Sequence, residues 1–139
     1  MKMKISVNSS CPCGSGLKYK KCCAPFHKGA LPKTALQLMR SRYCAFSAGD
    51  YKYIIKTTHE ENPDFSEDKE SWKESILQFC SSCSFQKLEI INFTDGENEA
   101  YVTFRASLLC ESKDSSFTEK SRFIKTNGMW RYHSGEFLQ

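Results

Sequence analysis

The sequence has no run of about 18 apolar residues, which is the length that a membrane-spanning helix needs. The lysines at its start are not followed by an apolar stretch, which argues against a secretory signal and against a lipoprotein signal at Cys11. Internal repeats and low-complexity tracts are also lacking. We therefore expect a cytoplasmic protein, and its 139 residues suffice for one ordinary domain and a small appendage.

Acidic residues are absent from positions 1–33, which contain seven lysines. The remaining 106 residues contain 13 basic and 16 acidic side chains. This asymmetry indicates two functional units, a basic head and a mildly acidic body. In the alternative interpretation, the lysines partly offset the negative charge of a metal site.

Four of the eight cysteines lie in the segment CPCGSGLKYKKCC, residues 11–23. In a reducing cytosol, clustered thiols are typically metal ligands or reactive groups rather than disulfides. A redox pair usually has two residues between its cysteines, next to a βαβ unit, and this pattern is missing here. Four thiolates complete the tetrahedral ligand set of a closed structural zinc site. The spacing thus predicts one structural zinc ion bound by Cys11, Cys13, Cys22 and Cys23.

Other residues of this segment favour the same interpretation. Gly14 and Gly16 let the loop turn sharply and can direct backbone N–H groups toward the sulfurs. Lys18, Lys20 and Lys21 can offset the negative charge of four thiolates, and nearby cations lower thiol pKa values.

The chain after the cysteines changes from helical to strand periodicity. Pro25, Gly29 and Pro32 indicate a linker. A helix is expected over residues 34–50, where Thr34 can cap the start and Gly49 can end the helix. The apolar residues that recur on one face of this helix are Leu36, Met39, Tyr43 and Phe46. Two more helices are expected over about 50–57 and over 66–80, the latter beginning at Ser66.

From residue 84 onward, apolar residues alternate with polar ones, which is typical of strands. The four expected strands are 85–93, 100–110, 117–125 and 129–133. Asp95-Gly96 and Asn127-Gly128 are predicted to form type I′ hairpin turns, which need positive φ at both central residues. Helices followed by an antiparallel meander predict an α+β fold.

The cysteine segment resembles the SEC-C motif, a small zinc finger best known from the C-terminus of the protein-translocation motor SecA. All four cysteines, both glycines and the basic residues between them match. The finger of SecA docks a chaperone and contacts the ribosome, so the resemblance implies that this segment is a docking module.

Three further segments resemble the YchJ family of small bacterial proteins: LMRSRYCAF (38–46), YIIKTTH (53–59) and SRFIKTNGMWRYHSG (121–135). The resemblance implies an N-terminal SEC-C motif over residues 1–30 and a nuclear-transport-factor-2-like domain over 31–139. In that fold, three helices pack into the concave side of a curved four-stranded antiparallel sheet and give a cone-like domain. The family has no established activity that the resemblance could transfer.

A pocket is the expected binding site of such a domain, because an apolar cavity with a few polar groups usually binds ligands. Arg40 and Arg42 flank the apolar face of their helix and can capture an anionic ligand, or they form ordinary ion pairs. The residues expected around the pocket are Arg40, Arg42, Tyr43, His59, Trp72, Arg122, Trp130 and His133. The two histidines can act as acid and base, but no nucleophile motif accompanies them, so no catalytic residue is assigned.

The other four cysteines are Cys44, Cys80, Cys83 and Cys110. Cys80 and Cys83 alone supply only half of a zinc site. We expect all four to be buried as small apolar side chains.

The sequence thus favours a cytoplasmic zinc protein that docks a protein partner with an acidic surface. The residues expected to contact this partner are Lys18, Tyr19, Lys20 and Lys21. One alternative is a small-molecule-binding protein or enzyme that uses the pocket. Another is binding of nucleic acid or the ribosome, with Tyr19 and Phe26 stacking on bases while the lysines contact phosphates. Homodimerisation through the sheet is a further option that the fold implies.

Overall fold

The computed structural model describes residues 5–138, so Lys2 and Lys4 of the basic head lie outside the described residues. No helix in this range is long and apolar enough to cross a membrane. The elements in chain order are a 3₁₀ helix η1 (Tyr19–Lys21), α1 (Ala24–His27), α2 (Ala35–Ala48), α3 (Tyr51–Lys56), α4 (Lys69–Ser82), β1 (Cys83–Thr94), β2 (Glu99–Cys110), β3 (Lys113–Asp114), β4 (Phe117–Thr126) and β5 (Met129–Leu138).

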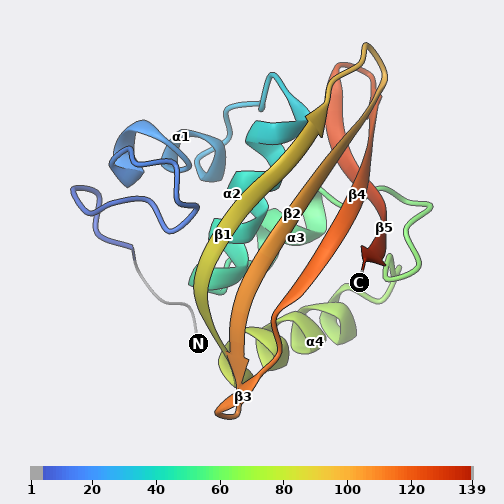
Figure 1. Cartoon of the computed structure of the whole chain (residues 1–139). Coiled ribbons are helices and arrows are strands. Elements are labelled where there is room, and N and C mark those ends of the chain that lie inside the picture. Colours follow the sequence, from blue (N-terminus) through green and yellow to red (C-terminus); the bar gives the residue numbers. More distant parts are fainter. Residues whose placement is uncertain (1–4, 139) are drawn as a thin grey trace.

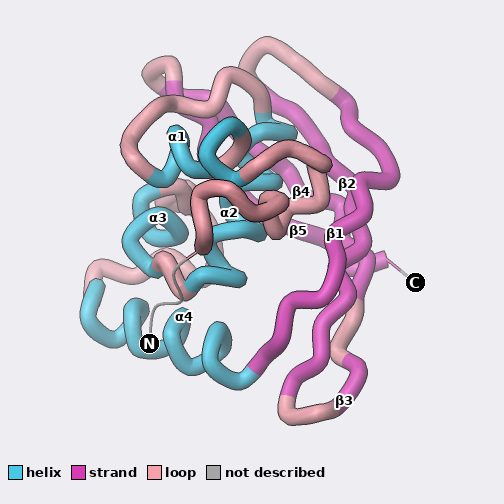
Figure 2. The backbone as a smooth tube through the Cα atoms, turned by 90° about the vertical axis from the view of Figure 1, so that its left-hand side faces the viewer, coloured by secondary structure: helices cyan, strands magenta, loops and turns pink. Residues whose placement is uncertain are grey.

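The strands form one antiparallel sheet in the order β1-β2-β4-β5, with the short β3 paired to β2. Bulges interrupt the pairing of β1 with β2 twice and that of β4 with β5 once. Bulges bend and twist strands, so they account for the curvature of the sheet. The helices lie together on one face of this sheet, which confirms the predicted α+β class (Figures 1 and 2).

Helix α2 is the central element, and it begins and ends where the sequence predicted. The Thr34 hydroxyl accepts a hydrogen bond from the Gln37 N–H in a capping box, and Gly49 ends the helix with φ of 71°. The helix contacts α1, α3 and α4 as well as β1, β2 and β5. Because α2 is covered on several sides, its residue Arg42 is buried, whereas we expected this side chain only to flank the buried face.

The core lies between α2 and the concave face of the sheet. The inward side chains of β2 alternate along the strand, and they are Ala100, Val102, Phe104, Ala106 and Leu108. Cys11, Cys13 and Cys23 belong to the same buried cluster as α2. The cysteine segment therefore packs against the body instead of standing apart from it.

Several boundaries differ from the prediction. Helix α4 begins at Lys69 instead of Ser66, because the Asp68 carboxylate accepts the Ser71 N–H and caps it. The segment Ala24–His27, expected to be part of a linker, forms the short helix α1. Strand β3 was not predicted, and β5 continues five residues beyond the expected end at 133.

The two predicted hairpin turns also differ from each other. Asn127 and Gly128 have φ of 52° and 77°, as a type I′ turn requires. Asp95 and Gly96 have no positive φ, so the type I′ prediction is wrong there. Strands β1 and β2 are joined by residues 95–98, and a loop longer than two residues does not need the mirror-image turn.

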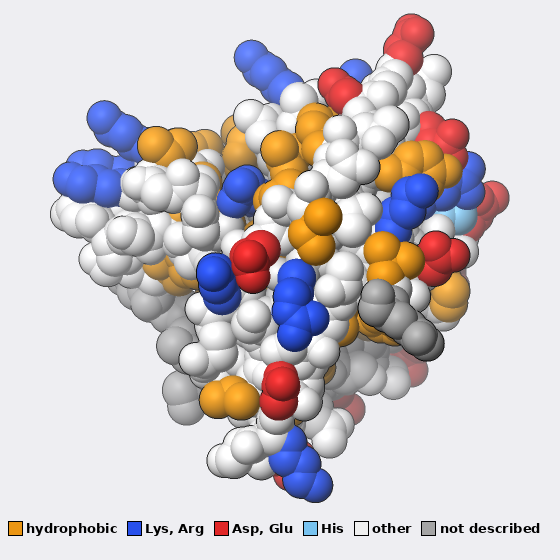
Figure 3. Space-filling view, viewed as in Figure 1, with side chains coloured by type: hydrophobic (Ala, Val, Ile, Leu, Met, Phe, Trp, Pro, Cys, Tyr) orange, Lys and Arg blue, Asp and Glu red, His pale blue; other side chains and the backbone are white. Residues whose placement is uncertain are grey.

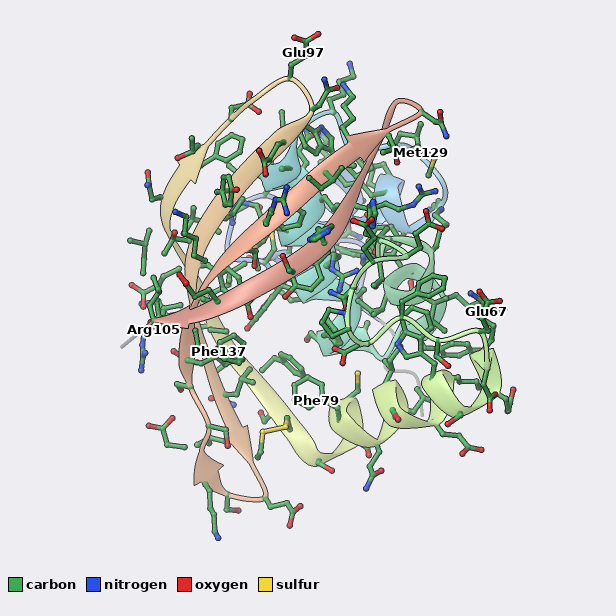
Figure 4. The ribbon with its side chains drawn as sticks, turned by 90° about the vertical axis from the view of Figure 1, so that its right-hand side faces the viewer. Glu67, Phe79, Glu97, Arg105, Met129 and Phe137 are labelled. Carbon is green, nitrogen blue, oxygen red and sulfur yellow. A yellow bond between two sulfur atoms is a disulfide. The ribbon has the colours of Figure 1, made fainter. Side chains whose placement is uncertain are left out.

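The prediction that all four remaining cysteines are buried apolar side chains is wrong for Cys83 and Cys110, which form a disulfide (Figure 4). These two residues face each other in the register of β1 and β2, so the sheet brings them together. Cys44 is fully buried and Cys80 is half-buried.

Candidate functional site

The four cysteines of the N-terminal segment form one cluster. Their sulfurs all lie within 4.8 Å of one another. The Cys13–Cys22 and Cys22–Cys23 sulfur distances are 3.5 Å and 3.9 Å. A tetrahedral zinc site with bonds of about 2.3 Å separates its sulfurs by about 3.8 Å. The donor set and its spacing therefore fit a metal ion such as zinc.

The loop that carries these cysteines is closed by its own backbone. Gly14 and Gly16 have φ of 78° and 87°, which glycine adopts without strain. The Cys11 N–H donates to the Leu17 carbonyl at 2.8 Å, and the Gly14 N–H donates to the Cys11 carbonyl at 3.1 Å. Gly14 thus turns the loop. We expected its N–H to point to a sulfur, but the N–H donates to the Cys11 carbonyl instead.

Side chains supply the polar contacts to the sulfurs instead. The Ser15 hydroxyl lies 3.1 Å from the Cys22 sulfur. Nη1 of Arg40 donates to the Cys13 carbonyl at 2.8 Å and lies 3.9 Å from the Cys13 sulfur. Arg40 was predicted at the pocket, and the structure places it at the cysteine cluster, where its charge can offset that of thiolates.

A fifth thiol lies beside the cluster. The sulfur of Cys44, on α2, is 3.8 Å from that of Cys11. Hydrogen bonds with the Cys13, Cys23 and Cys44 thiols lower the pKa of Cys11, whereas burial raises the pKa of Cys22 to about 11. The thiols of the cluster therefore differ in acidity.

His27 anchors the cysteine segment to α2, a role that the sequence did not indicate. Its Nε2 lies 2.9 Å from the Ser41 carbonyl oxygen and must donate to it. In the neutral imidazole, Nδ1 then accepts from the Tyr19 hydroxyl at 2.7 Å. The His27 ring also packs edge-on against Tyr53. A lone histidine four residues after a cysteine pair has no pattern that predicts such a role.

The four residues predicted to contact a partner divide into two groups. Lys18, Lys20 and Lys21 are exposed, and basic side chains project from the N-terminal segment at the left of Figure 3. Tyr19 is half-buried, and its hydroxyl is bound to His27. Of the four residues predicted to contact a partner, the three lysines are available on the surface.

A cavity lies between α2, α4 and the concave face of the sheet, and it contains three of the eight predicted pocket residues. Arg42 and Tyr43 come from α2 and Trp72 from α4. Figure 4 shows Phe79, a further lining residue that the sequence did not single out, on the side of α4 that faces the sheet. Its position could have been inferred from the helical periodicity of α4.

The two predicted histidines lie outside the lining of this cavity. The rings of His59 and His133 are 5.0 Å apart, and Nε2 of His133 is 3.0 Å from the Glu61 carboxylate. The Glu61 N–H donates to Nδ1 of His59 at 3.0 Å. Glu61 thus contacts both histidines, His59 through its backbone N–H and His133 through its carboxylate, at the junction of β5 and the loop after α3.

Arg122 and Trp130 are also placed elsewhere. Arg122 forms an ion pair with Glu99 of the neighbouring strand and is partly exposed to solvent. Trp130 is buried, and its indole N–H donates to the Lys33 carbonyl at 3.3 Å, which ties β5 to the start of α2. Both side chains therefore stabilise the fold and do not face the cavity.

Comparisons with known proteins agree with these features. A family model described as "YchJ, middle NTF2-like domain" matches residues 34–135, and one described as "SEC-C motif" matches residues 8–25. A UPF0225 protein of Streptomyces coelicolor is 39% identical over 132 residues, covering 92% of this chain and 95% of that protein. One of Vibrio parahaemolyticus is 40% identical, covering 93% of this chain and 75% of that protein.

Two solved structures of SEC-C motif containing proteins are similar over almost the whole chain. The solution structure of the Rhodopseudomonas palustris protein has a TM-score of 0.79 at 28% identity and covers 93% of this chain and 98% of that one. The crystal structure of the Psychrobacter arcticus protein has a TM-score of 0.72 at 26% identity and covers 96% and 82%.

Proposed function

The chain belongs to the YchJ family of UPF0225 proteins and joins a SEC-C motif to an NTF2-like domain, and we propose that it is a zinc-dependent docking protein. The four-cysteine cluster would hold one structural zinc ion. The exposed lysines that the cluster keeps in place would bind an acidic surface of a protein partner. The observation that carries the proposal is the position of these lysines directly between the two cysteine pairs.

Zinc is the metal that this donor set suits best. Four thiolates with no carboxylate or imidazole among them favour a closed tetrahedral site. Cys11, Cys13 and Cys23 are at most 4% exposed, so a bound ion would be shielded from water. When bound, zinc supplies a cross-link between the two ends of a loop that is too short to build a core of its own.

The lysines have the properties of a docking surface. Among the described residues, none of the ion pairs includes Lys18, Lys20 or Lys21. The segment contains no acidic residue that could compete with a partner. Charge complementarity of this kind raises association rates and orients the partner.

Native mass spectrometry tests the zinc site. We expect one zinc ion per chain, which is lost in Cys22→Ser. The matched control is Cys80→Ser, because Cys80 is also half-buried but lies outside the cluster. A folded wild-type chain that contains no metal would contradict the zinc assignment.

Affinity capture tests the docking surface. Deleting residues 1–30 would remove buried cysteines from the core, so we prefer the triple variant Lys18→Glu, Lys20→Glu, Lys21→Glu in the full chain. The control carries the same charge change at other exposed lysines, namely Lys52→Glu, Lys113→Glu, Lys120→Glu. Partners that are lost only with the first variant, and that survive nuclease treatment, support docking of a protein. Loss on nuclease treatment indicates nucleic acid, and identical partners in both variants contradict the proposal.

A further inference from the structure

We propose that the cavity between α2, α4 and the sheet binds a small monocarboxylate that has a compact apolar body. The proposal goes beyond the docking function and uses none of the residues assigned to it. Its basis is an arginine edge that opens onto the cavity and a buried hydroxyl, neither of which has a hydrogen-bond partner in the described chain.

The cavity consists of two adjoining chambers. The outer one has a volume of about 440 Å³ and the inner one about 210 Å³. The residues that line both chambers are Arg42, Phe46, Asp64, Phe79 and Tyr132. Six of the fifteen residues that line the inner chamber are phenylalanines, and the chamber is larger than the cavity of about 150 Å³ that accommodates benzene. An aromatic ring with a short extension therefore fits it.

Arg42 lies at the junction of the chambers, and three of its five guanidinium N–H groups make no hydrogen bond in the described chain. Its Nη1 donates to the hydroxyls of Thr57 and Thr58 at 2.8 Å and 3.1 Å, and to the Ile54 carbonyl at 3.2 Å. Within residues 5–138, no hydrogen-bond acceptor contacts its Nε or Nη2, and no carboxylate forms an ion pair with it. These two nitrogens form one edge of the planar guanidinium, and a carboxylate can accept both N–H groups in parallel.

The guanidinium remains a cation at neutral pH. Burial lowers the pKa of Arg42, but only to about 10. Its charge is partly stabilised by the ring of Tyr132, whose centroid is 4.7 Å away. A side chain that is 8% exposed thus presents a positive edge that lacks a counter-ion in direct contact.

Tyr43 supplies the second unpartnered group. Its side chain lines the inner chamber and is 5% exposed. Its hydroxyl is the one buried side-chain polar atom that has no hydrogen-bond partner in the described part of the chain. Leaving a buried hydroxyl unpaired costs free energy, because its contact with water is lost and nothing replaces it. A ligand oxygen in the chamber would satisfy it.

The acidic residues of the cavity limit the charge of the ligand. Glu119 is buried and accepts hydrogen bonds from the hydroxyls of Ser121 and Tyr132 at 2.6 Å and 2.8 Å. Asp64 lines both chambers. Two carboxylates beside one guanidinium disfavour a dianion such as a phosphate monoester. A monoanion is repelled less than a dianion and can still pair with the free edge of Arg42, and an apolar body suits the aromatic wall.

Isothermal titration calorimetry with the full zinc-loaded chain tests the proposal. The probes are 3-phenylpropionate, the neutral 3-phenylpropanol and the dianionic phenyl phosphate. We expect the carboxylate to bind at least about tenfold more tightly than either analogue, because the alcohol cannot form a charged pair with Arg42 and the dianion is repelled more strongly by Glu119 and Asp64. Equal affinity of acid and alcohol, or no binding of the acid at millimolar concentration, would overturn the proposal.

Substitutions at Arg42 and Tyr43 test separately whether the guanidinium and the hydroxyl contribute to binding. Arg42→Gln should weaken 3-phenylpropionate binding at least about tenfold. Tyr43→Phe should weaken it about three- to tenfold, and it keeps the proposal testable if Arg42→Gln does not fold. The control is Arg105→Gln, because Arg105 is exposed on β2 and lies far from α4 in Figure 4. Unchanged affinity in Tyr43→Phe and in folded Arg42→Gln would contradict the assignment.

Discussion

The cysteine cluster and the cavity lie on different faces of α2, and they differ in how their polar groups are satisfied. Arg40 and Cys44 point to the cluster, where sulfurs, Ser15 and Arg40 contact one another. Arg42 and Tyr43 point to the cavity. There, Nε and Nη2 of Arg42 and the Tyr43 hydroxyl have no hydrogen-bond partner in the described chain. On our proposals, a metal ion would complete the first face and a bound ligand would complete the second.

We therefore expect one face of α2 to contribute to stability and the other to ligand binding. The proposed four-thiolate zinc site would leave no open coordination position, so it would serve folding and not chemistry. An open cavity with an unpaired cation costs stability and is retained where binding requires it. Substitutions on the face toward the cysteine cluster should therefore lower stability, whereas substitutions on the face toward the cavity should mainly weaken ligand binding.

The largest effect is expected for Cys13→Ser. Cys13 is fully buried in the core, and its loss would remove both a zinc ligand and the cross-link that zinc supplies. We expect the free energy of unfolding to fall by at least about 3 kcal/mol, measured by urea denaturation. Cys80→Ser is the control and should change it by less than about 1 kcal/mol. Equal stability of the two variants would refute a structural metal site.

A smaller loss is expected for His27→Ala, which detaches the cysteine segment from α2 without touching a thiol. The substitution removes the hydrogen bonds to Tyr19 and Ser41 and the contact with Tyr53. We expect about 2 kcal/mol of destabilisation with one zinc ion still bound. Lys28→Ala, next in the chain and exposed, is the control. Loss of zinc from His27→Ala would show that the anchor and the metal site are one cooperative unit, contrary to this expectation.

Arg42→Met should abolish ligand binding at the cavity while it leaves the stability of the protein almost unchanged. The Thr57 and Thr58 hydroxyls keep their bonds to the carbonyls of Tyr53 and Ile54 when the arginine is removed. Replacing a buried cation with an apolar side chain of similar length is often close to neutral. We expect stability to change by less than about 1.5 kcal/mol while 3-phenylpropionate binding is lost. Urea denaturation measures the stability and calorimetry measures the binding on the same sample. A fall of more than about 3 kcal/mol in the free energy of unfolding would make Arg42 a structural residue.

Local chemistry made much of the fold predictable. Thr34 and Gly49 mark the ends of α2, and Asn127-Gly128 marks a hairpin, because caps and turns depend on a few neighbouring residues. The cysteine spacing likewise predicted the four clustered sulfurs, although not the sulfur of Cys44 beside them. The disulfide between Cys83 and Cys110 was missed because it depends on the register of two strands, which the local pattern does not determine.

The cavity was predicted only in part, for a geometric reason. Residues two apart on a helix point about 200° apart, so Arg40 and Arg42 cannot face one site. The sequence did not show which of them faces the sheet, because that depends on where the cysteine segment packs. His59 and His133 were grouped with the cavity as chemically suitable residues, but the fold pairs them with Glu61 at a separate place.

The smallest effect, and the sharpest test of the difference between the two faces, is expected for Tyr43→Phe. Its hydroxyl has no partner in the described chain, so removing it should leave stability unchanged or raise it by up to about 1 kcal/mol. The matched control is Tyr53→Phe, because Tyr53 is equally buried and its hydroxyl donates to the Ser41 oxygen at 2.6 Å. That variant should lose about 1 kcal/mol. Urea denaturation of both compares a satisfied hydroxyl with an unsatisfied one, and equal losses would mean that the Tyr43 hydroxyl has a partner in the ligand-free protein after all.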